Sequence, residues 1–293
     1  MNASGKAKTI VITGCDSGIG SELCRQYLER GYTVIAGYFG SAPDPVSARH
    51  RPLQLDLRSE KVIEEFAGSV KSLLSGNAVL VAVIQNAGAV AAAPIEDMPL
   101  DAVREIFEVN FFGAYSLTQK LIPLIIRDRS RIALVGSLAG RIALPFFSPY
   151  VASKFAIEGF ADSLRREMRP FGVRTVLFEP AAVATPIWNT SWERVRRDFL
   201  PRISARYRAV FEATGSAFVA GGNRGMPTEE ASRRMIRVLS RKRPRARYIL
   251  SKSSFLTAFE LLLPSSLMDR LIALAFGTSK LGKADSVAEE RAP

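Results

Sequence analysis

Histidine and cysteine are nearly absent from the sequence, which has only His50, Cys15 and Cys24. So few ligands leave no His-rich or Cys-rich zinc site, and we expect no bound metal. A Ser-His-Asp triad is possible only through His50. The two cysteines lie in a chain whose N-terminus has no apolar segment behind its charges, which is typical of reduced thiols in a cytoplasmic protein.

Long uncharged apolar runs are also missing, and a membrane-spanning helix needs about 18 or more such residues. The nearest candidate is the stretch 255–276, which is interrupted by Glu260, Pro264, Asp269 and Arg270. We therefore expect no spanning helix. The stretch could still lay an apolar face on a membrane surface beside basic residues. Packing on the sheet or on another subunit is the alternative.

An excess of basic side chains gives the chain a formal charge of +12, which raises nucleic acid and anionic membranes as partners. The arginines gather in residues 194–208 and 233–247, and such runs are usually solvated helix faces. A nucleic-acid binder combines clustered phosphate contacts with stacking aromatic residues. No fold of that type is legible in the sequence, so we expect no nucleic-acid partner.

The hydrophobic pattern alternates between strand-like and helix-like segments, and no linker divides residues 1–252. Short apolar runs, typical of strands buried on both faces of a parallel sheet, occupy residues 9–12, 33–36, 79–84, 131–135, 174–178 and 247–250. Helical periodicity fills about 18–30, 60–75, 100–127, 150–169 and 227–241. This alternation predicts a single domain over residues 1–252, with a doubly wound parallel α/β sheet of the Rossmann type.

Two segments depart from this alternation. Residues 186–225 form a long insertion in which aromatic residues are set among arginines. Because ligands bind beyond the carboxyl ends of the strands in open α/β sheets, we expect this insertion to be a helical lid over a substrate site. An ordinary helical excursion that packs on the core is the alternative. Residues 253–293 are expected to form an apolar helical extension and a tail.

A glycine-rich loop, residues 13–20, follows the first expected strand and precedes a helix. Glycines at Gly14, Gly18 and Gly20 let the backbone turn sharply and approach a ligand. Free N–H groups at a helix start attract a pyrophosphate, so the loop indicates a dinucleotide site. A tight turn without any ligand is the alternative.

Tyr150 and Lys154 lie at positions i and i+4 of an expected helix, and therefore on one face of it. A cation beside a phenol favours the phenolate and would bring the tyrosine pKa of about 10 toward neutrality, as general acid-base catalysis requires. Ser137 stands at the end of an expected strand, where α/β sheets present reactive groups. A second pair, Tyr248 and Lys252, begins in an expected strand, whose geometry keeps the two side chains apart.

The glycine spacing Gly-x-x-x-Gly-x-Gly, together with the Tyr-x-x-x-Lys element, resembles the short-chain dehydrogenase/reductase family. Further matches cover residues 9 to about 185: Gln85-Asn86-Ala87-Gly88, Asp56-Leu57, Asn110, and the stretch from Pro180 to Thr185. Gln85 and Ala181 depart from the family pattern, where asparagine and glycine stand, and the second departure puts the form of the local turn in doubt.

The resemblance implies an NAD(P)-dependent oxidoreductase whose Tyr150 exchanges a proton with a substrate oxygen while hydride moves to or from nicotinamide. Ser137 would orient that oxygen, Lys154 would lower the tyrosine pKa and hold the nicotinamide ribose, and Asn110 would anchor a water. The residues implied to bind the nucleotide are Gly14, Ser17, Gly18, Ile19, Gly20, Tyr38, Asp56, Leu57, Asn86, Ala87, Gly88, Tyr150, Lys154, Val183 and Thr185. A nucleotide-sensing or membrane-associated regulator of the same fold is the alternative.

The nucleotide and the substrate are less closely defined by the sequence. Tyr38 stands where NAD enzymes carry an acidic residue, and the lack of a carboxylate there favours NADP over NAD. Within the family the chain resembles the retinol and hydroxysteroid dehydrogenase branch, which implies a lipophilic alcohol or ketone as substrate. The resemblance also implies a homodimer or homotetramer.

Overall fold

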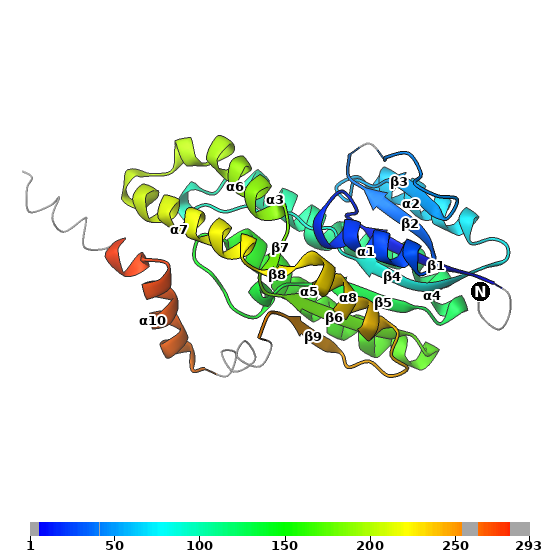
Figure 1. The fold of residues 1–293 in the computed structure, drawn as a ribbon. Coiled ribbons are helices and arrows are strands. Elements are labelled where there is room, and N and C mark those ends of the chain that lie inside the picture. The colour runs from blue at the N-terminus through cyan, green and yellow to red at the C-terminus, as the bar shows by residue number, and fades with distance from the viewer. Residues whose placement is uncertain (1–5, 41, 254–262, 282–293) are drawn as a thin grey trace, which may run out of the picture.

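A parallel sheet forms the centre of the molecule. The computed structural model describes residues 6–40, 42–253 and 263–281. Within them, seven parallel strands lie in the order β3-β2-β1-β4-β5-β6-β9 (Figure 1). The strands are β1 (Ala7–Thr13), β2 (Thr33–Tyr38), β3 (His50–Gln54), β4 (Ala78–Gln85), β5 (Arg131–Val135), β6 (Arg174–Pro180) and β9 (Arg247–Leu250). This arrangement confirms the doubly wound α/β fold expected from the sequence.

The central strands are apolar at consecutive positions because both of their faces are covered. Ile10, Val11 and Ile12 of β1 have no exposed surface. The strand that no apolar run predicts is β3, which contains Pro52 and lies at the edge of the sheet. Proline is tolerated there because an edge strand has a free hydrogen-bonding side.

Helices cover the sheet on both faces. The helices α1 (Gly18–Glu29) and α8 (Thr228–Leu239) pack on one face, where Leu23 and Met235 join the core (Figure 1). The opposite face carries α2 (Glu60–Leu73), α4 (Gly113–Asp128) and α5 (Ser148–Met168). Between α2 and α4 the chain forms α3 (Leu100–Phe107) and a π-helix (Glu108–Phe112). All five helical segments expected from periodicity are therefore present.

The insertion forms a pair of helices beyond the carboxyl ends of the strands (Figure 1). Its helices are α6 (Ile187–Asp198) and α7 (Ala205–Asn223), and the short strands β7 (Val183–Ala184) and β8 (Met226–Pro227) flank it. The pairing of β7 with β8 closes the insertion at its base. Phe199 and Phe211 of the insertion join a hydrophobic cluster with Ala91–Ala93 and with Phe146. We call residues 186–225 the lid, after the role that the sequence predicts for them.

Two tryptophans of α6 pack into glycine notches on α7. A Cβ atom at Gly222 would lie 2.1 Å from Cδ2 of Trp188, and one at Gly215 would lie 2.0 Å from Cη2 of Trp192. The Trp188 indole N–H also donates a hydrogen bond to the Val183 carbonyl (2.6 Å). Both indoles are thus packed between the two helices of the lid.

Helix α10 (Ser265–Ala275) stands apart from the sheet and appears in orange-red in Figure 1. None of its residues is buried, and one side carries Leu267, Leu271 and Leu274, with 44%, 46% and 72% of their surface exposed. Across the residues that the structure describes, no helix has the length and apolarity to cross a membrane. The rest of the expected C-terminal extension, residues 254–262 and 282–293, lies outside the described residues.

The close contact of the tryptophan rings with α7 predicts that Gly→Ala, which usually stabilises a helix, destabilises the protein at Gly222. Gly→Ala in a helix ordinarily gains about 0.5–1 kcal/mol. At Gly222 the new methyl group would overlap the Trp188 ring, so we expect Gly222→Ala to lower the free energy of unfolding by about 1–3 kcal/mol. Gly221→Ala is the matched control, because no atom lies within 4 Å of a Cβ there, and it should be neutral or stabilising. Chemical denaturation measures both, and equal stabilisation would contradict the packing.

Candidate active site

Three candidate residues converge at the carboxyl end of β5. Ser137 follows that strand, and its Oγ accepts a hydrogen bond from the Ala139 N–H (3.1 Å). Tyr150 and Lys154 lie in the first two turns of α5, where their i, i+4 spacing places them on one face. The Ser137 hydroxyl lies close enough to the phenol of Tyr150 to act on its pKa, which it lowers. The structure therefore brings together the three side chains that the sequence singled out.

Lys154 is held from two sides. Its Nζ donates to the Val135 carbonyl (3.1 Å) and lies 5.7 Å from the centre of the Tyr150 ring. A Cβ at Gly88 would lie 3.5 Å from the same Nζ, so the loop after β4 closes over the ammonium group. Only 5% of the lysine surface is exposed. The cation is thus fixed beneath the phenol in a largely dry environment.

Burial dominates the electrostatics of this pair. It lowers the pKa of Lys154 to about 8, and the Glu158 carboxylate opposes that change. Burial also raises the pKa of Tyr150, with the Ser137 hydroxyl acting in the opposite direction. The sequence alone predicts a lowered tyrosine pKa, and the structure differs because burial of the phenol itself penalises the phenolate.

Asn110 is positioned by the π-helix between α3 and α4, an irregularity that is frequent at functional sites. Its Oδ1 accepts from the Ala89 N–H (2.7 Å), and its Nδ2 donates to the Ala89 carbonyl and to Ser153 Oγ (2.9 Å). Ser153 lies between Tyr150 and Lys154 on α5. The amide therefore ties the loop after β4 to the helix that carries the tyrosine, in addition to the role in holding a water expected above.

The glycine loop has the geometry of an anion cradle. Gly14 and Gly18 have φ values of +68° and +61°, which favour glycine, and a Cβ at Gly20 would lie 2.0 Å from the Gly14 carbonyl. Ser17 makes no side-chain cap, and the first turn of α1 holds no acidic residue. The N–H groups at the start of α1 are therefore available to a pyrophosphate, and the loop fits a dinucleotide.

Two further loops border this cradle. Thr13 Oγ1 accepts from the N–H groups of Asn86 and Ala87 (both 3.0 Å), and Asn86 Nδ2 donates to the Gly14 carbonyl (3.1 Å). A Cβ at Gly18 would lie 3.1 Å from Thr185, which places the end of β7 against the glycine loop. Ala181, whose turn the family comparison left in doubt, does not have a positive φ and so needs no glycine.

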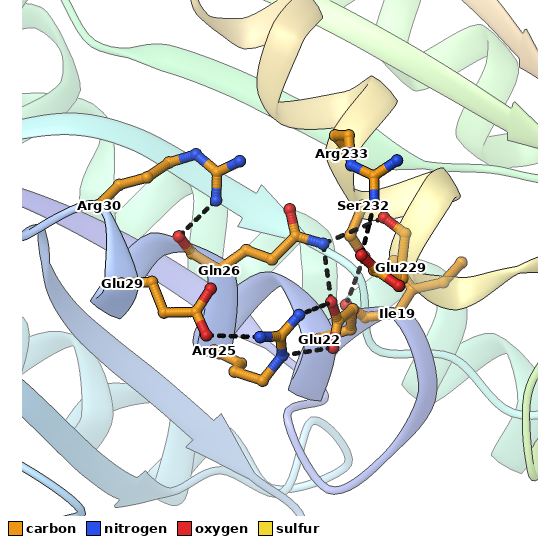
Figure 2. Close-up of polar contacts among 9 residues, drawn as sticks. All are labelled: Ile19, Glu22, Arg25, Gln26, Glu29, Arg30, Glu229, Ser232 and Arg233. Carbon is orange, nitrogen blue, oxygen red and sulfur yellow. Dashed lines mark hydrogen bonds and ion pairs between the residues drawn. The ribbon is translucent and has the colours of Figure 1, made fainter.

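Helix α8 braces α1 immediately behind the cradle (Figure 2). Gln26 donates to the Glu229 carbonyl (3.0 Å), and Ser232 Oγ donates to the Ile19 carbonyl (3.4 Å). Because α8 directly follows the lid, these contacts connect the lid to the nucleotide-binding helix. Exposed ion pairs line the same junction: Arg25 with Glu22 and Glu29, and Arg233 with Glu229.

At the other end of the cradle, three residues implied to bind the nucleotide are occupied by protein contacts. Tyr38 Oη lies 3.3 Å from His50 Nε2. The Asp56 carboxylate is paired with Arg58 (2.8 Å), whose guanidinium lowers the pKa of that carboxyl. Leu57 packs against α4, where a Cβ at Gly113 would overlap its carbonyl. All three lie at or just after the carboxyl ends of β2 and β3, and their role in nucleotide binding stays a prediction.

Asp16 is a site residue that the sequence reasoning missed. Its carboxylate accepts hydrogen bonds from the backbone N–H groups of Phe39 (3.0 Å) and Gly40 (3.3 Å), directly after β2. The Arg58 guanidinium lies 4.8 Å from the centre of the Phe39 ring. The glycine loop therefore supplies the carboxylate that the end of β2 lacks. Only the fold reveals this, because 23 residues separate Asp16 from Phe39.

Phe146 was also not foreseen. It has φ +71°, an outlier for a bulky residue, and its carbonyl accepts from the Ala93 N–H (2.9 Å). Its ring packs against Phe211 of the lid, with ring centres 5.5 Å apart. This residue joins the lid to the loop that leads into α5, and no sequence signal marks a left-handed phenylalanine.

Comparisons with known proteins agree with this geometry. The family model described as short chain dehydrogenase matches residues 8–196. NADPH-dependent 3-dehydrocapnine reductase of Ornithobacterium rhinotracheale is 28% identical, with 89% of this chain and 94% of that protein covered. Human retinol dehydrogenase 16 is 35% identical, with 73% of this chain and 68% of that protein covered. A short chain dehydrogenase from Burkholderia cenocepacia in complex with NADP superposes with a TM-score of 0.67 at 23% identity, covering 91% of this chain and 97% of that one.

Proposed function

The chain belongs to the short-chain dehydrogenase family of NAD(P)-dependent oxidoreductases, and we propose that it interconverts an alcohol and a carbonyl on a lipophilic small molecule. One observation carries the proposal: Ser137, Tyr150 and Lys154 meet at the carboxyl edge of the sheet, beside a glycine loop that fits a dinucleotide. That juxtaposition supplies a proton donor next to a hydride carrier.

The residues of the chain divide the chemistry among them. A bound nicotinamide supplies or accepts the hydride. The Ser137 hydroxyl orients the substrate oxygen, and Tyr150 Oη transfers a proton to that oxygen in reduction or removes it in oxidation. The Lys154 ammonium favours the phenolate electrostatically and binds ribose hydroxyls. Asn110 holds the loop after β4 against α5, so that Lys154 and Tyr150 keep their relative positions.

Replacing the proposed acid-base group tests this function. We expect Tyr150→Phe to lower kcat by about 10²–10⁴-fold, while nucleotide binding persists, because the loop and Lys154 remain. Tyr248→Phe is the matched control: Tyr248 also precedes a lysine by four residues, but it lies in β9 and its Oη accepts from the Arg245 N–H. Undiminished turnover by Tyr150→Phe would overturn the mechanism. Nucleotide binding without turnover in the unaltered protein would favour the nucleotide-sensing alternative.

An apolar substrate is supported by the composition of the lid region. Ala91–Ala93, Phe146 and the lid residues Phe199 and Phe211 form one hydrophobic cluster next to Tyr150. Apolar surroundings of this kind beside the phenol favour a lipophilic ligand held by a few polar groups. The similarity to a retinol dehydrogenase points the same way. Turnover of alcohols and ketones of graded size, followed by nicotinamide absorbance, would identify the class.

The nucleotide preference follows from Asp16 in this proposal. The sequence favoured NADP because Tyr38 provides no carboxylate at the end of β2, but Asp16 brings one there from the glycine loop. The nearby Arg58 is already paired with Asp56 and Glu105, which offsets its charge. A 2′-phosphate would meet a net negative surface, whereas a ribose hydroxyl could donate to Asp16. We therefore propose a preference for NAD over NADP, although one relative is named as NADPH-dependent.

Neutralising that carboxylate should change the preference. Titration calorimetry of the unaltered protein is expected to give tighter binding of NAD than of NADP. In Asp16→Asn the ratio should move toward NADP by about tenfold, since removing one repulsion of 1–2 kcal/mol corresponds to that factor. Asp44→Asn removes an equal exposed charge before β3 and should leave the ratio unchanged. A ratio that favours NADP in the unaltered protein would contradict the assignment.

Exposed aromatic residues on one face of the protein support an interface between copies of this chain. Phe112, Tyr115 and Phe155, on the π-helix, α4 and α5, have 52%, 47% and 45% of their surface exposed. Exposed aromatic residues that cluster on neighbouring helices indicate an interface. We propose a homodimer or homotetramer through this face, and a monomeric mass in sedimentation equilibrium would contradict it.

Membrane contact through α10 extends the same proposal. Leu267, Leu271 and Leu274 recur at helical spacing on its exposed side, beside Arg270. Such a face inserts shallowly between lipid headgroups. We expect Leu271→Glu to reduce flotation of the protein with vesicles that contain anionic lipid, whereas Asp269→Asn should not reduce it. Absence of flotation by the unaltered protein would exclude the contact.

A further inference from the structure

Two buried carboxylates lie behind the candidate active site, and the mechanism above does not use them. Glu158 follows Lys154 by one turn of α5 and is 9% exposed, and Glu179 of β6 has no exposed surface. Within the described part of the chain, Glu158 Oε1 and both oxygens of Glu179 accept no hydrogen bond. Buried carboxylate oxygens without hydrogen bonds are costly, so a nearby counter-charge is needed to offset that cost.

Arg247 supplies that counter-charge from β9, the last strand of the sheet. Its Nε lies 3.1 Å from Glu158 Oε2 and 3.4 Å from Glu179 Oε1. Its Nη1 lies 3.1 Å from Oδ1 of Asp162, one turn beyond Glu158 on α5. Arg141 approaches Glu179 from the opposite side, at 3.7 Å. One guanidinium thus faces both buried carboxylates.

Side chains of alternating charge lead from β9, at the edge of the sheet, to the hydroxyl of Tyr150. Arg247 is positive, Glu158 negative and Lys154 positive, and Lys154 lies beneath Tyr150. Glu158 and Lys154 share a face of α5 as i and i+4 neighbours, and a Cβ at Gly136 would lie 3.4 Å from Glu158 Oε1. The carboxylate therefore sits below the loop that presents Ser137.

We propose that Glu158, held ionised by Arg247, is a positioning residue that keeps Lys154 in its ammonium form and thereby makes the Tyr150 phenolate accessible. This inference rests on the proposed function of Tyr150 and adds to it a support that acts through Lys154. Glu158 touches neither substrate nor nucleotide in this scheme. Its contribution is electrostatic and is transmitted by one neighbour.

The pH dependence of this support follows from the groups that face Glu158. These are Lys154 and Asp162 on its own helix, Arg247 on β9, Glu179 on β6, and Arg141 in the loop after β5. Burial and the Glu179 charge raise the pKa of Glu158 to about 7, against the action of Arg247. The carboxylate is therefore present above that pH and is lost as the pH falls through it.

Glu158→Gln tests the inference with little change in shape. Without the carboxylate, Lys154 should lose its proton at lower pH, so its pKa, about 8 in the unaltered protein, should move down by about one unit. Above about pH 8, kcat should fall by up to about tenfold, the equivalent of one pKa unit. The chemical shift of the Lys154 side chain, assigned with Lys154→Arg, reports the titration without substrate or nucleotide. Nucleotide affinity should stay within about twofold.

The direction of the shift separates this role from others. Loss of the Glu158 charge should lower the pKa of Lys154, so a Lys154 titration that stays in place or moves to higher pH overturns the inference. Asp162→Asn is the matched control, since Asp162 binds the same arginine one turn farther from Lys154, and it should leave the titration unchanged. Arg247→Met should shift it in the same direction as Glu158→Gln, with partial rescue by Arg247→Lys.

Failure of the inference and failure of the proposed function give different results. If Tyr150→Phe abolishes turnover while Glu158→Gln leaves the titration in place, only the role of Glu158 is wrong. If Tyr150→Phe turns over normally, the function itself is wrong, whatever Glu158→Gln does.

Discussion

The constraint on which the active site depends is the burial of one ammonium group. Lys154 must carry a proton to favour a phenolate, yet desolvation lowers its pKa from 10.5 to about 8. Burial therefore disfavours the charged form of the lysine. The Val135 carbonyl, which accepts a hydrogen bond from Nζ, and the carboxylate of Glu158 reduce this penalty. The site is accordingly a region where the fold gives up stability for chemistry.

The surrounding elements are connected so that the separate parts of the site keep their relative positions. Thr13 and Asn86 join the glycine loop to the loop after β4, and Asn110 joins that second loop to α5. The lid enters through β7, which touches the glycine loop at Gly18, and leaves through β8 into α8, which braces α1. Nucleotide loop, lid and catalytic helix therefore form one connected unit at the carboxyl edge of the sheet. A movement of the lid would be transmitted to α1 through the hydrogen bonds that Ser232 and Gln26 make between α8 and α1.

Local pattern was sufficient for the fold and for the position of the candidate residues, because strand burial and helical periodicity are properties of neighbouring residues. Local pattern did not predict features that depend on contacts between residues far apart in the chain. Edge strand β3 carries Pro52 and no apolar run, so its pairing with β2 had to be seen. Asp16 reaches the end of β2 only through the turn of the glycine loop. The raised pKa of Tyr150 depends on how deeply the whole pair is buried, which the i, i+4 spacing does not specify.

Arg247 is a further residue whose role depends on partners that are distant in the sequence. It is paired across the sheet with Leu177, and this register places its guanidinium between Glu158, 89 residues earlier, and Glu179. Every residue implied to bind the nucleotide precedes β9, yet without β9 the Glu158 carboxylate would lack this cation and would take up a proton more readily. Glu158 would then no longer oppose the loss of the Lys154 proton. In the proposed scheme the last strand thus supports Lys154 electrostatically, although it contributes nothing that touches the reacting atoms.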